Sequence, residues 1–198
     1  MRKKFVLSAC LVMGMALLGS CGGPQHLKLS SVDTDTIYVA KDGSIELVDV
    51  EDFDKDYYSQ SELKDFIKDS IDTYTETADS GTVKMLDLSV KDKVAKVLLS
   101  MDSADTYTGF QGENLRLVSV EEAAGDNLVL PETFKSAKDG SSVAKDEILS
   151  QSGLQFLVVS EELSIQLEGE IVYYSDASLT GDNVVETTGD KTAVIVFK

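Results

Sequence analysis

The stretch Thr36-Ile-Tyr-Val-Ala-Lys-Asp-Gly-Ser-Ile-Glu-Leu-Val-Asp-Val50 predicts the first β-hairpin of the fold. Two runs rich in Ile, Val, Leu and Tyr, 36–40 and 44–50, flank an Asp-Gly pair, which is typical of a hairpin turn. In the second run, Ile45 and Leu47 fall on one face of an extended strand, whereas Val48 and Val50 fall on the other face. We therefore expect a β-bulge there, because one extra residue would reconcile the two phases.

The segment after this hairpin predicts the main helix. Ser59 with Glu62 three residues later forms a capping box, which marks a helix N-terminus, and Gly81 lies just past the expected end. Apolar residues between them recur every three to four positions, so one side of the helix should pack on a sheet. These apolar residues are Leu63, Phe66, Ile67, Ile71 and Tyr74.

Further apolar runs predict that strands outnumber helices. Gly169 stands in phase with inward-facing residues, which marks a bend or a close approach of neighbouring backbone. We expect an α+β fold, strand-dominated, with antiparallel hairpins and one main amphipathic helix packed on a sheet. The expected hairpins pair Val83–Val90 with Val94–Met101 and Val184–Thr187 with Thr192–Phe197. Other strands are expected within Leu115–Val120, Leu154–Ser160 and Leu163–Tyr174, and short helical turns at Ser119–Gly125 and Lys145–Ser152.

The N-terminal residues have the pattern of an export signal. Residues 2–4 are basic and precede an apolar stretch, 5–18. That stretch is too short to cross a roughly 30 Å hydrocarbon core, which takes about 20 helical residues. Basic residues before a short apolar region are typical of a secretory signal peptide. Small residues then end at Ser20, directly before Cys21, and this arrangement resembles the lipobox of bacterial lipoproteins.

The lipobox resemblance implies cleavage between Ser20 and Cys21 and attachment of a diacylglyceryl group to the Cys21 thiol. Two acyl chains anchor a protein stably, at about 0.8 kcal/mol per buried methylene. We therefore expect a palmitate-type membrane anchor on the extracytoplasmic face of the cell membrane. The alternative is an ordinary secretory signal in which Cys21 is incidental.

The chain divides by composition into four parts. We expect a signal peptide over 1–20, a tether over 21–32, an α+β lobe over 33–125 and a β-rich lobe over 126–198. The last two form either separate lobes or one continuous domain.

The charge balance of the chain excludes one class of partner. Residues 1–20 hold three of the 18 basic residues and none of the 35 acidic ones, so the remainder has a net charge of −20. A surface of this sign repels phosphate backbones, and we expect no nucleic-acid binding. It also repels anionic lipid headgroups, so the lipid on Cys21 must supply the anchoring.

The acidic-aromatic segment Asp49–Tyr58 holds the candidate metal ligands. Asp52, Asp54 and Asp56 have the alternate spacing with which calcium loops begin. The sixth position is Tyr57 rather than glycine, and the acid expected at the twelfth position comes one residue early. The alternative is a charged loop whose acids favour the positive end of the following helix.

No residue set with the spacing of a catalytic site is found. The only histidine is His26, which excludes Ser-His-Asp, Cys-His and multi-histidine zinc sites. A carboxylate pair of the kind that hydrolyses glycosides remains open, but sequence selects no pair from 35 acids. We expect no cofactor and no catalytic residue.

Several patches resemble a group of uncharacterised cell-surface lipoproteins of Clostridia-type Gram-positive bacteria. They are Lys41-Asp-Gly-Ser44, Glu51-Asp-Phe-Asp-Lys-Asp-Tyr-Tyr58, Glu62-Leu-Lys64, Gly169-Glu-Ile-Val-Tyr-Tyr-Ser175 and Ala193-Val-Ile-Val-Phe-Lys198. The resemblance implies a cell-surface lipoprotein and no particular activity. We therefore expect a non-enzymatic, lipid-anchored protein whose partner is an envelope protein or the wall. The competing expectations are an envelope hydrolase with a carboxylate pair and a calcium-dependent adhesin.

Overall fold

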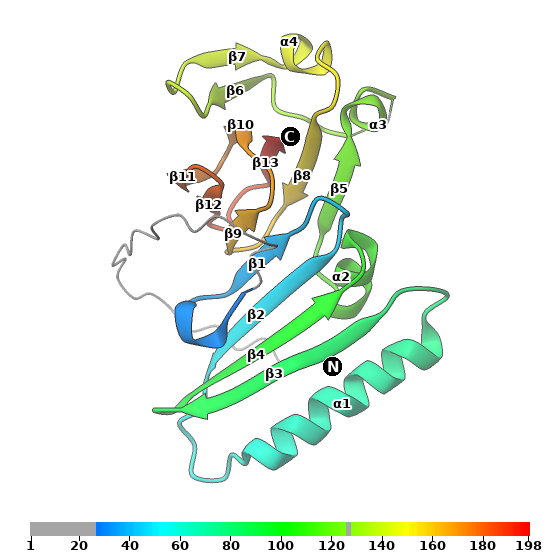
Figure 1. Ribbon diagram of the computed structural model, residues 1–198, viewed down its shortest axis with the longest axis vertical. Helices are drawn as coiled ribbons and strands as arrows, with labels where there is room; N and C mark the ends of the chain where they lie inside the picture. Colours follow the sequence, from blue (N-terminus) through cyan, green and yellow to red (C-terminus); the bar gives the residue numbers. More distant parts are fainter. Residues whose placement is uncertain (1–26, 126–127) are drawn as a thin grey trace.

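The computed structural model describes residues 27–125 and 128–198 (Figure 1). Within them the fold is α+β and strand-dominated, as predicted, with one main helix packed on a sheet. The helical elements are η1 (Leu29–Ser31), α1 (Gln60–Thr77), α2 (Ala104–Gln111), α3 (Val120–Gly125) and α4 (Lys145–Leu149). The strands are β1 (Thr36–Val39), β2 (Ile45–Asp52), β3 (Val83–Lys91), β4 (Val94–Met101), β5 (Leu115–Ser119), β6 (Thr133–Ser136), β7 (Ser142–Ala144), β8 (Gln155–Val159), β9 (Ser164–Leu167), β10 (Ile171–Ser175), β11 (Ser178–Gly181), β12 (Val184–Glu186) and β13 (Ala193–Phe197).

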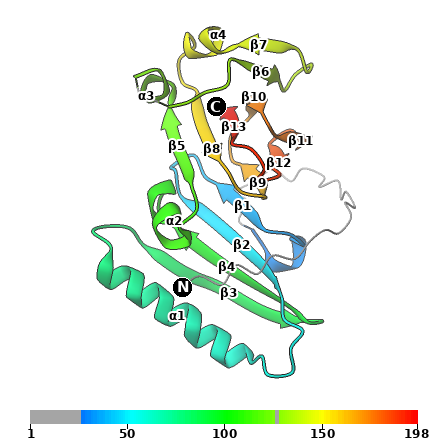
Figure 2. The ribbon, with the colours of Figure 1, turned by 180° about the vertical axis from the view of Figure 1, so that it is seen from behind.

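The strands form two sheets that share one core. Sheet A has the order β11-β12-β9-β1-β2-β4-β3, and sheet B has the order β5-β8-β13-β10-β6-β7. Neighbouring strands are antiparallel, except that β1 and β9 run parallel. The largest apolar cluster takes side chains from both sheets, so the sheets pack on each other through it. Helix α1 and the β6–β7–α4 group lie at opposite ends of the molecule (Figures 1 and 2).

The hairpin β1–β2 forms where the sequence predicts it, but the expected bulge is wrong. The register of β2 is continuous against both β1 and β4. The apolar phase changes because β2 is buried on both faces: Ile45 and Leu47 enter the shared core, whereas Val48 enters a separate cluster on the outer face. A strand covered on both sides carries apolar residues in both phases.

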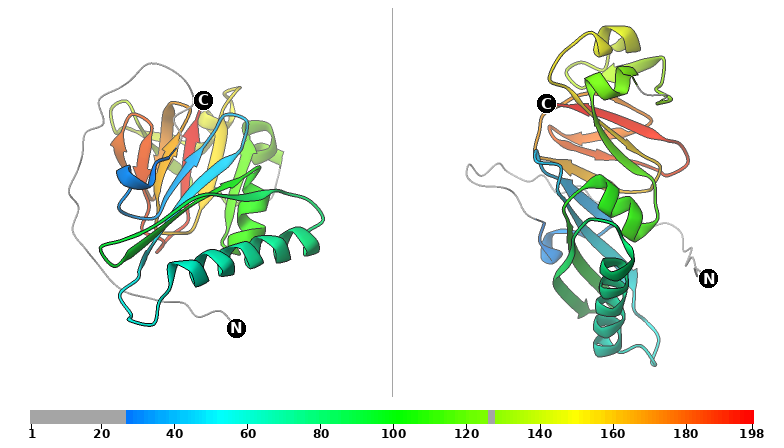
Figure 3. Two further views of the ribbon diagram at one scale, coloured as in Figure 1. Left: turned by 60° about the horizontal axis from the view of Figure 1, so that its bottom comes forward. Right: turned by 90° about the vertical axis from the view of Figure 1, so that its right-hand side faces the viewer.

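The outer face of sheet A is covered by the chain before β1. Leu27, Leu29 and Val32 are buried there against Tyr38, Val48 and other residues of the sheet. Figure 3 shows η1 on the opposite side of the sheet from α1 and α2. The tether predicted for residues 21–32 is therefore wrong for its last six residues, because their apolar side chains complete a core. Residues 21–26 lie outside the described residues.

Helix α1 begins and ends near the predicted positions, but its packing differs from the prediction in two ways. Ser59 is the N-cap residue, yet its hydroxyl makes no capping bond and instead lies 2.8 Å from the Ser61 hydroxyl. The capping box predicted there is therefore wrong. No residue of α1 is fully buried, and Phe66 is 68% exposed. The residues that pack against the shared core are Ile67, Ile71 and Tyr74.

The C-terminal strands are divided between the sheets: β9, β11 and β12 lie in sheet A, and β8, β10 and β13 lie in sheet B. Gly169 lies at the bend between β9 and β10, and a Cβ there would be 2.5 Å from the Lys198 carbonyl oxygen. This confirms the predicted close approach. The closing hairpin of Val184–Thr187 with Thr192–Phe197 is wrong, because β12 pairs with β9 and β11 in sheet A whereas β13 pairs with β8 and β10 in sheet B.

The two predicted lobes are not separate in space. Strand β9 of the second lobe pairs with β1 of the first, and β8 pairs with β5. A boundary between 125 and 126 would cut both sheets and the shared core. The alternative of one continuous domain is the arrangement observed.

Candidate functional site

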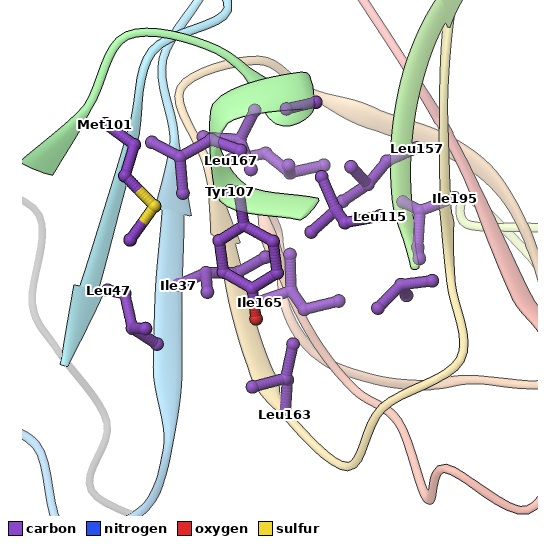
Figure 4. Close-up of a cluster of buried hydrophobic side chains, with 14 of the residues drawn as sticks. Ile37, Leu47, Met101, Tyr107, Leu115, Leu157, Leu163, Ile165, Leu167 and Ile195 are labelled. Carbon is purple, nitrogen blue, oxygen red and sulfur yellow. The ribbon is translucent and has the colours of Figure 1, made fainter. Parts of the chain in front are cut away.

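A group of ionisable side chains lies at one end of the shared core, beyond its apolar residues. Tyr107 of α2 is buried in the cluster, and Figure 4 shows its hydroxyl oxygen pointing to the side on which Leu163 lies. Glu161, in the connection between β8 and β9, meets this hydroxyl. Asp35 precedes β1, and Asp49 lies on β2. We call Asp35, Asp49, Glu51, Tyr107 and Glu161 the acidic end.

The Tyr107 hydroxyl donates a hydrogen bond of 3.0 Å to Oε2 of Glu161. The other carboxyl oxygen, Oε1 of Glu161, is buried and has no hydrogen-bond partner. Burial raises the pKa of Glu161 to about 7, against the lowering effect of the tyrosine bond, and the charges of Glu113 and Asp35 add to the rise. The pKa of Tyr107 is raised as well, first by burial and then by the charge of Glu161.

Asp49 is half-buried on the inner face of β2, opposite Val97 of the shared core. Burial raises its pKa to about 7, and the charges of Asp35 and Glu51 act in the same direction. The pKa of Asp35 is raised by burial, although its Oδ1 accepts a 2.8 Å hydrogen bond from the Val50 amide. The cause throughout is that carboxylates are removed from water beside other carboxylates.

A carboxyl group with a pKa near 7 is able to donate or accept a proton at neutral pH, which is what general acid–base catalysis needs. Catalysis also needs a cleft that admits a substrate to the carboxyl. The two pockets described, of about 660 and 720 Å³, are lined neither by Asp49 nor by Glu161. Asp49 and Glu161 thus hold protons in the folded protein at pH values at which an unperturbed carboxyl group has lost them.

The calcium candidates lie at the end of β2 and in the following loop. Asp52 is the last residue of β2, and Asp54 is bonded to Lys55, with 2.8 Å between Oδ1 and Nζ. This bond to Lys55 lowers the pKa of Asp54. Over residues 27–125 and 128–198, no three His, Cys, Asp or Glu side chains come together in a group that could hold a metal ion. The structure does not assemble Asp52, Asp54 and Asp56 into a calcium site.

The loop that holds Asp54 and Asp56 also brings three aromatic rings together. The ring centroids of Phe53 and Tyr58 are 4.8 Å apart, and those of Tyr57 and Tyr58 are 5.0 Å apart. Tyr57 is 76% exposed. The turn of the loop brings Phe53 into contact with Tyr58, five residues later in the sequence.

Sequence reasoning did not select the residues of the acidic end. Asp49 was visible as an acid in phase with Ile45 and Leu47, which is a local signal of a charged group on a buried face. No local signal marks Glu161, because the residues around it are distant in the sequence: Tyr107 of α2, Asp35 before β1 and Glu113 before β5. Ser20 and Cys21, the predicted cleavage and lipidation residues, lie outside the described residues.

Across the part of the chain that the structure describes, no helix has the length and apolar character needed to cross a membrane. No family model, no curated protein and no solved structure matches this chain.

Proposed function

We propose that this chain is a lipid-anchored protein of the extracytoplasmic face of the cell membrane, which offers a binding or structural surface in the envelope without catalysis. The lipobox-like order of basic residues, apolar residues, Ser20 and Cys21 supports the anchor. The acidic remainder, with a net charge of −20, supports a surface that stays in water.

One structural observation carries the proposal. Leu27, the first residue that the structure describes, lies six positions after Cys21 in the sequence and is buried against sheet A. Six residues span at most roughly 20 Å when fully extended. An acylated Cys21 would hold the folded body beside the bilayer, with the outer face of sheet A close to the attachment point.

The anchoring is tested by growing expressing cells with radiolabelled palmitate. Label is expected in the wild-type protein and in Cys10→Ala, because Cys10 lies in the segment that cleavage removes. Label should be lost in Cys21→Ala, and that variant should leave the membrane fraction. Label that persists in Cys21→Ala, or a wild-type protein free of lipid, would contradict the anchor.

A further inference from the structure

The loop between β2 and α1 holds three aromatic rings in contact, and one of them is largely exposed. We call Phe53–Tyr58 the aromatic loop. Phe53 and Tyr58 are half-buried, whereas the Tyr57 ring stands at 81° to the Tyr58 ring and is 76% exposed. A tyrosine that is this exposed buries little apolar surface on folding, so packing within the monomer does not account for a tyrosine at this position.

Backbone hydrogen bonds hold the aromatic loop in place. The Phe53 amide donates to the Lys93 carbonyl oxygen at 2.7 Å, which ties the loop to the turn between β3 and β4. The Tyr58 amide donates to the Lys55 carbonyl oxygen at 3.0 Å. A surface whose rings are already ordered loses less conformational entropy when a partner binds.

Residues 52–62 hold four acidic side chains against one lysine, Lys55, whose charge acts on both tyrosines, and the Lys93 charge acts on Asp54. Asp54 is already paired with Lys55, while Asp52 and Asp56 are exposed carboxylates at either side of that pair. Glu62 adds a further acid in the first turn of α1, and Phe66, one turn later, is 68% exposed. Aromatic rings next to carboxylates complement a cation carried on an apolar stem, by cation–π contact and by ionic hydrogen bonds.

We infer that the aromatic loop binds an arginine- or lysine-bearing segment of a partner protein. The rings stack tilted and edge-on rather than around a cavity, and neither described pocket is lined by them. This open geometry fits a side chain on an extended segment better than a small quaternary ammonium ion, which aromatic cages enclose. Tyrosine is enriched among the residues that contribute most to binding at protein interfaces. The inference rests on the proposed binding surface and does not depend on the anchor.

The test uses the full-length protein in detergent micelles and a fluorescently labelled peptide of alternating arginine and glycine, read by fluorescence anisotropy. The wild type should bind the peptide, with an affinity that falls as salt rises. Tyr57→Ala should weaken binding about two- to fivefold, as expected for one exposed cation–π contact. Tyr57→Phe keeps the ring and should bind like the wild type.

A matched pair of substitutions separates local from overall charge. Asp56→Asn should weaken binding, whereas Asp182→Asn, an exposed acid in the turn between β11 and β12, should not. Equal loss in both variants, unchanged binding in Tyr57→Ala, or no binding by the wild type would overturn the inference. Binding of tetramethylammonium without binding of the peptide would also overturn it, in favour of a quaternary ammonium ligand.

The inference and the proposed anchor fail separately. Peptide binding should be retained in Cys21→Ala, because the aromatic loop lies in the folded body. A result in which palmitate labelling is absent but the peptide binds would contradict the anchor alone.

Discussion

At the scale of single residues, Gly169 shows how closely the bend between β9 and β10 approaches Lys198. The Glu170 amide donates to the Lys198 carbonyl oxygen at 3.0 Å, and the Lys198 amide donates to the Glu170 carbonyl oxygen at 3.1 Å. These two bonds fix the backbone of the chain end against the bend. A side chain on Gly169 would meet the same carbonyl at 2.5 Å and the Phe197 ring at 2.8 Å.

Gly169→Ala is expected to lower the free energy of unfolding by about 1–3 kcal/mol, because the added methyl group overpacks against backbone that cannot move freely. Urea denaturation followed by circular dichroism measures the change. Gly125→Ala is the matched control, since no described atom beyond its chain neighbours and its own helix lies within 4 Å of the added Cβ. Its unfolding free energy should stay within about 0.5 kcal/mol of the wild type, and a similar loss in both variants would contradict the close approach.

Asp49 makes the stability of the fold depend on pH in an unusual direction. Its pKa is about 7 in the folded protein against 3.8 when unperturbed, so between these values the folded state holds a proton that the unfolded chain releases. The free energy of unfolding therefore falls as pH rises from about 4 to about 7. At about 1.4 kcal/mol for each pKa unit, the total change approaches roughly 4 kcal/mol.

Asp49→Asn is expected to flatten this part of the stability curve and to raise the unfolding free energy at pH 7, because asparagine does not ionise. Urea denaturation at several pH values between 4 and 8 gives the curve. Glu161 keeps its own contribution of the same sign in this variant. The exposed control Asp182→Asn should follow the wild-type curve, and a wild type that gains stability from pH 4 to pH 7 would refute the role of Asp49.

At the scale of elements, two helix starts with the same sequence signature behave differently. At α3 the Ser119 hydroxyl accepts from the Glu122 amide at 3.2 Å, while Glu122 Oε2 accepts from the Ser119 amide at 2.8 Å. These two reciprocal bonds form a capping box at the start of the short helical turn expected at Ser119–Gly125. At α1 the Ser59 hydroxyl makes no such bond.

Ser119→Ala should therefore cost about 0.5–2 kcal/mol of unfolding free energy, the usual loss on removing an N-cap hydroxyl. Ser59→Ala should cost less than Ser119→Ala, because only the contact with Ser61 is removed. Both are measured by urea denaturation at pH 7. Equal losses would mean that Ser59 caps α1 in solution.

The elements that sequence predicts well are those with local signals. The hairpins β1–β2 and β3–β4 and helix α3 follow from turn residues, alternation and a capping pair within a few positions. Helix α2 was missed because Thr106, Thr108 and Gly109 are weak helix formers. Its signals were the caps: Ser103 accepts from the Thr106 amide, and Gly112 ends the helix in the left-handed region.

At the scale of the whole molecule, the missing information is which strands meet. The parallel pair β1–β9 joins two segments that are more than a hundred residues apart in the sequence. The consecutive strands β12 and β13, by contrast, lie in different sheets. No short-range pattern encodes either. The acidic end has the same origin, since Asp35, Tyr107 and Glu161 meet only after both sheets form.

This interleaving predicts that the body unfolds as one unit. Ile37 of β1 and Ile165 of β9 are fully buried in the same cluster and form a register pair, so neither half keeps its core when the other melts. Differential scanning calorimetry should give a single transition whose calorimetric and van't Hoff enthalpies agree. Ile165→Ala should lower the unfolding free energy by about 2–5 kcal/mol and move the whole transition, because the cavity opens in the core that both sheets share. Two resolved transitions, or a shift of one of them only, would show that the halves fold independently.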